Sequence, residues 1–251
     1  KWHIGDNYPY RPQDRGFETV VAHKGGGVGQ TPDFWGNNYF DDTYFHNGVP
    51  QKHDGYCTDV WFDAALDFIR EHQNEPFFCY IATNAPHSPY LVPEHYREMY
   101  ADNSEIREPA FYGMITNIDD NFARLWRELT RLGIEENTVL IFMTDNGTSG
   151  GWFNEAPRGY NAGMRGKKCS YYEGGHRVPF FLRWPAGNLD GGKDVDKMAL
   201  HVDFLPTLMD MCGLKSNRVS GLDGYSLMPL MREDREFEGA GRVHFMQYRQ
   251  S

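Results

Sequence analysis

The sequence predicts an α/β fold, with a mixed and largely parallel sheet packed between helices. Residues 139–143 predict a strand buried on both faces, because the run is apolar, rich in Val, Ile and Phe, and followed by polar turn residues. Residues 56–71 and 108–132 have the three- and four-residue apolar spacing of helices. A chain of 251 residues fits one large α/β domain.

Residues 1–50 predict long ordered loops, because they show little periodicity and are rich in Gly, Pro, Asn, Asp and Tyr. The run 25–29 lacks the G-x-G-x-x-G spacing of a dinucleotide-binding turn, and Gln-Thr-Pro follows where a helix should open. We interpret it as a loop. Residues 40–43 contain two aspartates without a preceding apolar strand, so we expect a solvated turn.

The helix predicted over 56–71 repeats its apolar residues every three or four positions, and Thr58 or Asp59 is able to cap it. The apolar run 76–82 that follows predicts a buried strand. Together they form a helix–strand unit.

The next loop places His87 between two prolines. Each proline fixes its own φ and restricts the preceding residue, so a loop of this kind can aim an imidazole at a ligand. A surface histidine in a proline-rich turn is the alternative interpretation.

The clearest helix spans 108–132 and is expected to stop at Gly133. The strand 139–143 follows it directly. The apolar stripe of this helix comprises Phe111, Ile115, Ile118, Phe122, Leu125, Leu129 and Leu132.

Asp145 and Asn146 follow the strand 139–143 and precede Gly147. Ligands bind outside the carboxyl ends of strands in open α/β sheets, and a carboxylate beside an amide oxygen suits a hard cation such as Ca²⁺ or Mg²⁺. The alternative is a turn in which Asp145 bonds its own backbone and Gly147 supplies a positive φ.

The loop 148–166 is long enough to wall a pocket. Lys167 and Lys168 then form a candidate anion clamp, although adjacent lysines are also common on surfaces. Residues 180–184 predict another strand, and 198–212 predict a strand end that feeds a helix with a proline near its first turn.

Composition limits the class of function. The net charge of −10 argues against a nucleic-acid binder that works through general electrostatics. No stretch approaches the roughly 18 to 20 continuous apolar residues of a membrane span. The four cysteines form no C-x-x-C pair, so they do not settle the redox compartment.

Taken together, these stretches resemble the sulfatase family, within the alkaline-phosphatase-like group. Sulfatases carry G-K-W-H-L-G, P-H-x-P, S/T-D-N-G and K-G-x-x-Y-E-G-G segments in this order. The matching segments are Lys1–Gly5, Ala85–Pro89, Thr144–Gly147 and Lys168–Gly175, followed by His201–Thr207 and Asp223–Leu227.

The resemblance implies roles for four side chains. Lys1 and Lys168 would bind the sulfate oxygens, with Lys167 as the fallback because Cys169 follows Lys168 where the family usually has Gly. His87 would protonate the leaving group, and His3 would hold and later deprotonate the nucleophile.

The resemblance also implies that Asp145 and Asn146 are metal ligands, to Ca²⁺ or else Mg²⁺. Two parts of the family's site are missing from the sequence. No Cys or Ser lies in the C/S-x-P-S/T-R motif from which sulfatases make their formylglycine nucleophile, and the family's early Asp-Asp metal pair is absent.

We therefore expect residues 1–235 to be the central and C-terminal part of a sulfatase catalytic domain, and 236–251 to begin a further segment, with truncation at both ends. The expected function is sulfate ester hydrolysis, and the 251-residue chain is expected to be inactive alone. A phosphodiesterase or phosphonate hydrolase of the same superfamily and a nucleophile-free binding protein are the alternatives.

The expected partner is a sulfated small molecule or glycan, and Trp152, Phe153, Tyr10 and Arg11 are candidate walls of its pocket. No nucleic-acid partner and no membrane span are expected. Sulfatases are often exported or lysosomal, so the resemblance implies an extracytoplasmic location.

Overall fold

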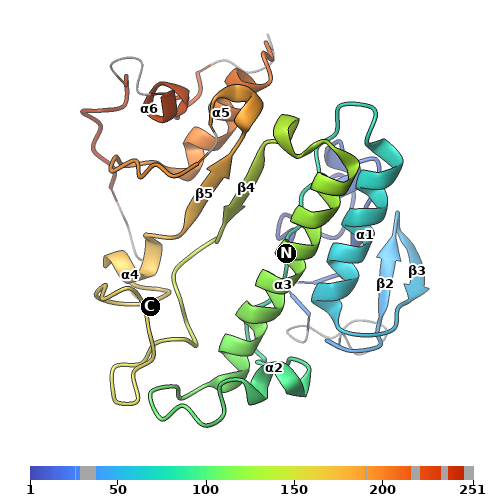
Figure 1. The fold of residues 1–251 in the computed structure, drawn as a ribbon, viewed down its shortest axis with the longest axis vertical. Helices are drawn as coiled ribbons and strands as arrows, with labels where there is room; N and C mark the ends of the chain where they lie inside the picture. Colours follow the sequence, from blue (N-terminus) through green and yellow to red (C-terminus); the bar gives the residue numbers. More distant parts are fainter. Residues whose placement is uncertain (26, 29–37, 190, 216–220, 233–236, 246–251) are drawn as a thin grey trace.

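Two helices form the centre of the computed structural model, which describes residues 1–251 except 26, 29–37, 190, 216–220, 233–236 and 246–251. They are α1 (Cys57–His72) and α3 (Pro109–Leu132), and they pack side by side (Figure 1). A three-stranded sheet lies beside α1, and a two-stranded sheet lies on the other side of α3 (Figure 1). This mixture of helices and strands confirms the predicted α/β class.

Both sheets are small. The first sheet has the order β1–β2–β3, and in the second, Leu140 lies opposite Arg183 and Met143 opposite Phe180. Every strand pair in the described part of the chain is antiparallel. The α/β class is therefore confirmed, but the predicted parallel pairing does not occur among the described strands. The strands are β1 (Val21–Ala22), β2 (Thr43–His46), β3 (Val49–Lys52), β4 (Leu140–Met143) and β5 (Phe180–Arg183).

Short helices connect or close these elements. None of the described helices is long and apolar enough to cross a membrane. The short helices are η1 (Pro12–Arg15), α2 (Glu94–Glu98), η2 (Glu135–Asn137), α4 (Glu173–His176), η3 (Pro185–Gly187), η4 (His201–Asp203), α5 (Phe204–Met211) and α6 (Met228–Arg232).

The four elements with the strongest sequence patterns are confirmed to within one residue at each end. They are α1, α3, β4 and β5. Gly133 ends α3 as predicted, with a left-handed φ of 70° and its N–H bonded to the carbonyls of Leu129 and Thr130. The predicted helix within 198–212 is α5, but the strand end predicted before it is wrong, because residues 198–200 form no strand and η4 leads into the helix.

The predicted strand 76–82 is wrong, because these residues form no strand in the structure. Burial does alternate along the run: Phe77 and Cys79 are half-buried, whereas Phe78 and Tyr80 are 60% and 58% exposed. A strand also needs a backbone partner, and no described strand pairs with this segment.

The prediction of loops alone over 1–50 is also incomplete, because β1, β2 and β3 form a sheet there. Asp42 is buried rather than solvated, and its carboxylate accepts hydrogen bonds from the backbone N–H groups of Thr43 (2.7 Å) and Asn38. Charge-assisted bonds of this kind replace the water that the sequence pattern suggested. Positions 26 and 29 of the glycine-rich run lie outside the described residues.

The polar contacts between α1 and α3 correct two further details. Thr58 and Asp59 do not cap α1; instead the Asp59 carboxylate accepts hydrogen bonds from Asn117 (2.9 Å) and Asn121 (2.7 Å) of α3. Both asparagines are therefore buried on the face that packs against α1, and Ile115 of the predicted stripe is 43% exposed. The tertiary partner, rather than apolar periodicity, sets which face of α3 is buried.

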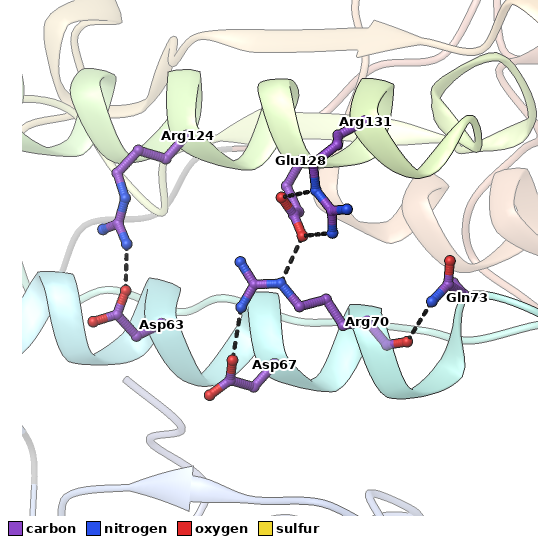
Figure 2. A network of polar contacts seen from close by, with 7 residues as sticks. All are labelled: Asp63, Asp67, Arg70, Gln73, Arg124, Glu128 and Arg131. Atoms are coloured by element: carbon purple, nitrogen blue, oxygen red, sulfur yellow. Dashed lines mark hydrogen bonds and ion pairs between the residues drawn. The ribbon is translucent and has the colours of Figure 1, made fainter.

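On the exposed side of the same helix pair, charged side chains link α1 to α3 (Figure 2). Glu128 accepts hydrogen bonds from Arg70 and Arg131, each with a closest N–O distance of 2.6 Å. Arg124 pairs with Asp63.

A buried ion pair ties the end of the described chain to the region around η4. Two guanidinium nitrogens of Arg242 donate to the two carboxylate oxygens of Asp203, each at 2.6 Å. Burial alone would raise the pKa of Asp203, but Arg242 and the backbone N–H groups of Tyr225 and Leu200 lower it overall. The predicted domain boundary at 235/236 and residues 246–251 lie outside the described residues.

Candidate active site

The loop that carries His87 is held from beneath by a buried asparagine. The Asn84 side-chain oxygen accepts hydrogen bonds from Trp61 Nε1 (3.0 Å) and Cys57 Sγ (3.5 Å), both on α1. Burial raises the pKa of Cys57 to about 12, so its thiol keeps the proton that it donates. The loop is thereby fixed to the first turns of α1.

Two main-chain hydrogen bonds then fix His87 itself. Its N–H donates to the Asn84 carbonyl (3.0 Å), and its carbonyl accepts from the Tyr39 hydroxyl (3.0 Å). Tyr39 is fully buried, and burial raises its pKa to about 12, so the hydroxyl remains a donor.

The orientation of the His87 ring follows from its neighbour. Nδ1 lies 2.8 Å from the Ser88 carbonyl oxygen. Because a carbonyl only accepts, Nδ1 must carry a proton, and Nε2 is then the nitrogen that can gain or lose one. Once Nε2 is protonated as well, this half-buried ring can donate that proton to a leaving group.

Lys1 lies at the end of the segment 76–82. Its main-chain nitrogen donates a hydrogen bond to the carbonyl of Ala82 (2.8 Å). Burial lowers the pKa of its side chain, the positive charge of Lys168 lowers it further, and the Asp145 carboxylate opposes both effects. Lys1, Lys168 and Asp145 therefore share one neighbourhood, although no direct ion pair joins them.

The loop after β4 is hydrogen-bonded through its backbone to the segment that carries Lys167 and Lys168. Gly147 N–H donates to the Gly175 carbonyl (3.0 Å), and Lys168 N–H donates to the Thr148 carbonyl (2.8 Å). These two bonds set the segment that bears Asp145 and Asn146 beside the segment that bears Lys168.

The reason for glycine at 147 differs from the turn alternative. Its φ is not in the left-handed region, so no positive φ is required there. Instead, a Cβ at this position would overlap the carbonyl oxygen of Gly174. Close approach of the two loops requires the glycine.

The oxygen ligands available for a metal are few. Asp145 is exposed and makes no hydrogen bond or ion pair with the described residues, and Asn146 adds one side-chain amide oxygen. Among the described residues no group of three or more His, Cys, Asp or Glu side chains could hold a metal. The donor type fits a hard cation, but two side chains supply only part of the six to eight oxygens that Ca²⁺ takes.

The other predicted site residues are less closely tied to this neighbourhood. His3 is exposed, with a left-handed φ of 62°. Tyr10 is 49% exposed, and the Arg11 guanidinium makes two 2.8 Å bonds to Asp14 within η1. Trp152 is half-buried and forms an isolated bridge with Gly159. Their roles remain predictions.

Sequence reasoning missed Tyr39 and Asn84, the two residues that hold His87. Asn84 had a usable signal, because it lies three residues before His87 at the end of an apolar run. Tyr39 had none, because it lies 48 residues from the carbonyl that it contacts.

Comparison with known proteins gives a consistent set of relatives. The family model described as Sulfatase matches residues 6–214. YdeN, an uncharacterized sulfatase of Escherichia coli (strain K12), is 28% identical over 235 residues, which are 91% of this chain and 39% of the relative. Arylsulfatase J of Mus musculus is 28% identical over 251 residues, 93% of this chain and 39% of the relative.

Among solved structures, Ps i-CgsB in complex with k-i-k-neocarrahexaose has a TM-score of 0.80 and 27% sequence identity, covering 92% of this chain and 53% of that chain. The chain thus spans well under half the length of the two curated relatives that it matches.

Proposed function

Because the chain belongs to the sulfatase family of the alkaline-phosphatase-like superfamily, we propose that its site takes part in the hydrolysis of sulfate esters. The observation that carries the proposal is the shared neighbourhood of Lys1 and Lys168, which are far apart in sequence. In a protein of net charge −10, two ammonium groups whose charges act on each other are suited to an anionic ligand.

The lysines would stabilise charge on the sulfuryl oxygens. This charge persists through the transition state. Cations that are already in position lower the energy of the transition state, because they need not move during the reaction. The partial burial of Lys1 strengthens the interaction, because less water screens it. Lys168 is preferred over Lys167 because its charge is the one that acts on Lys1.

His87 would protonate the leaving oxygen through Nε2, while the Ser88 carbonyl holds Nδ1–H. His3 would accept a proton from the nucleophile. The chain contains no Cys or Ser in a C/S-x-P-S/T-R motif, so none of its residues is assigned as the nucleophile.

Asp145 and Asn146 would hold a Ca²⁺ or Mg²⁺ ion, which would supply further positive charge to the sulfate oxygens. Because the described residues provide only these two ligand side chains, we expect the chain to bind the metal weakly. Tight binding of Ca²⁺ by the 251-residue chain in calorimetry would contradict this.

A sulfated glycan is the substrate class that we favour over a small aryl sulfate. The support is that a related structure of 27% identity was solved with a bound oligosaccharide. This support bears on the ligand class and leaves the individual sugar open.

The test is expression of the full reading frame together with a formylglycine-generating enzyme, followed by assays on aryl sulfates, sulfated sugars and a phosphonate monoester. We expect turnover of sulfate esters, and about a 10²- to 10⁴-fold loss in His87→Ala. We expect no turnover by the 251-residue chain. Preferential cleavage of the phosphonate would favour the phosphonate hydrolase instead, and binding without turnover would favour the binding protein.

A further inference from the structure

Two cations, Arg107 and Lys167, lie over the ring of Phe153, and Lys167 directly precedes Lys168 of the candidate active site. The guanidinium carbon of Arg107 lies 4.8 Å from the centre of the Phe153 ring, and Nζ of Lys167 lies 5.8 Å from the same centre. We call these three residues the Phe153 cluster. They come from three separate segments, so the fold brings the group together.

The Phe153 side of the cluster is held in place by backbone and hydroxyl contacts. Phe153 N–H donates to the Arg158 carbonyl (2.8 Å), which closes the turn that carries the ring. The Tyr112 hydroxyl of α3 donates to the Gly151 carbonyl (2.8 Å) and accepts from Tyr160 N–H (3.0 Å). The turn is thus anchored to α3, which begins two residues after Arg107.

The Lys167 side is fixed by the loop of the candidate active site. Lys167 directly precedes Lys168, whose N–H bonds to the Thr148 carbonyl. Lys167 is directed to the Phe153 ring, whereas the charge of Lys168 acts on Lys1. The side chains of the two adjacent lysines therefore interact with different residues, Lys167 with Phe153 and Lys168 with Lys1.

Neither cation of the Phe153 cluster has a carboxylate partner among the described residues. Arg107 is exposed and Lys167 half-buried, and the Phe153 ring is the side-chain partner of both. Glu105, Glu108 and Glu155 lie close in sequence to Arg107 or Phe153, but their carboxylates form no ion pair with either cation. By contrast, Arg70, Arg124 and Arg131 are each paired with a carboxylate (Figure 2).

We propose that the Phe153 cluster is a second subsite, which binds an additional sulfate or carboxylate group on a sugar adjoining the one whose ester is cleaved. The inference rests on the proposed function. A guanidinium can bond an oxyanion with two parallel N–H groups, and the lysine adds a second positive charge. The ring attracts both cations and so holds the two charges close to each other.

The test compares the affinities of two probes for the protein from the full reading frame, with His87→Ala blocking turnover. One probe is a disaccharide with a single sulfate ester, and the other carries a second sulfate on the neighbouring sugar. Calorimetry should give tighter binding of the disulfated probe by about tenfold or more, the ratio that one charge-assisted bond provides. A third probe, with a carboxylate in place of the second sulfate, identifies which oxyanion is preferred.

Arg107→Gln should reduce this affinity ratio to within about twofold of unity. Arg127→Gln is the matched control, because Arg127 is also exposed and lies on α3 without an ion pair to the described residues. It should leave the ratio unchanged. Thermal unfolding of both variants checks that each is folded.

An unchanged affinity ratio in Arg107→Gln would overturn the proposed subsite. An equal fall of the ratio in Arg127→Gln would also overturn it, because general electrostatics would then explain the preference. Failure of the proposed function is a separate result: the protein with intact His87 would not turn over the monosulfated probe. In that case a ratio lost only in Arg107→Gln would still establish an anion-binding site at the Phe153 cluster.

Discussion

The position of His87 depends on one buried hydroxyl. The Tyr39 O–H donates to the carbonyl of His87, and the same residue's Nδ1 is satisfied by Ser88. Tyr39 is therefore a positioning residue, which acts through the loop rather than on the substrate.

Tyr39→Phe removes this hydroxyl while keeping the ring. A hydrogen bond of this kind is worth about 0.5–1.5 kcal/mol net, so kcat should fall about three- to tenfold in the protein from the full reading frame. The alkaline limb of its pH–rate profile should also shift, because His87 must be protonated to act as the acid and its imidazole is held less firmly. Tyr44→Phe, in the same apolar cluster, is the control, and an equal effect there would show that Tyr39 acts through stability alone.

Gly147 is the residue at which the two site loops touch. Gly147→Ala would place a methyl group against the Gly174 carbonyl, and overpacking typically costs about 1–3 kcal/mol. We expect a lower free energy of unfolding by denaturant. Gly241→Ala, which meets no atom within 4 Å, should change it little. Equal stability of the two variants would contradict the proposed contact between the loops.

At the scale of the elements, apolar periodicity predicted α1, α3, β4 and β5, because each has its own strong pattern. It failed where a partner distant in sequence decides the outcome. Asp59 could not be recognised as the acceptor for Asn117 and Asn121, since helical spacing carries no information about another helix. The run 76–82 has the composition of a strand, but composition does not provide a neighbour to pair with.

The charged network between α1 and α3 predicts a specific response to acid (Figure 2). Hydrogen bonds from Arg131 and Arg70 lower the pKa of Glu128 from 4.5 to about 2. Because the pKa in the folded state is the lower one, the stabilisation is fully present above pH 4.5 and is lost as the pH falls toward 2.

The measurement is the free energy of unfolding of the unaltered chain and of Glu128→Gln between pH 2 and 7. The difference between them should be constant from pH 7 to about 5, shrink below that, and disappear near pH 2. Glu71→Gln is the control, since Glu71 is exposed and makes no ion pair with the described residues. A difference that does not change with pH would show that the ion pairs contribute nothing.

At the scale of the whole molecule, the order of the short segments along the chain was more informative than any one of them. Asp145 and Asn146 alone fitted a metal pair or an ordinary turn equally well. Their placement beside Lys168, through the bonds of Gly147 and Thr148, now supports the site interpretation. The contact of Tyr39 with His87 could not be predicted. Phe153 was a candidate pocket wall, but only the folded chain brings it together with Arg107 and Lys167.

The central claim is that Lys168, rather than Lys167, binds the sulfate whose ester is cleaved. The most direct measurement is kcat/KM for an aryl sulfate with a single anionic group, in the protein from the full reading frame and in its Lys168→Ala and Lys167→Ala variants. Loss of one preorganised charge typically costs about 10²- to 10³-fold, so we predict a loss of that size in Lys168→Ala and a much smaller one in Lys167→Ala. Equal losses, a larger loss in Lys167→Ala, or no turnover of sulfate by the unaltered protein would contradict the account.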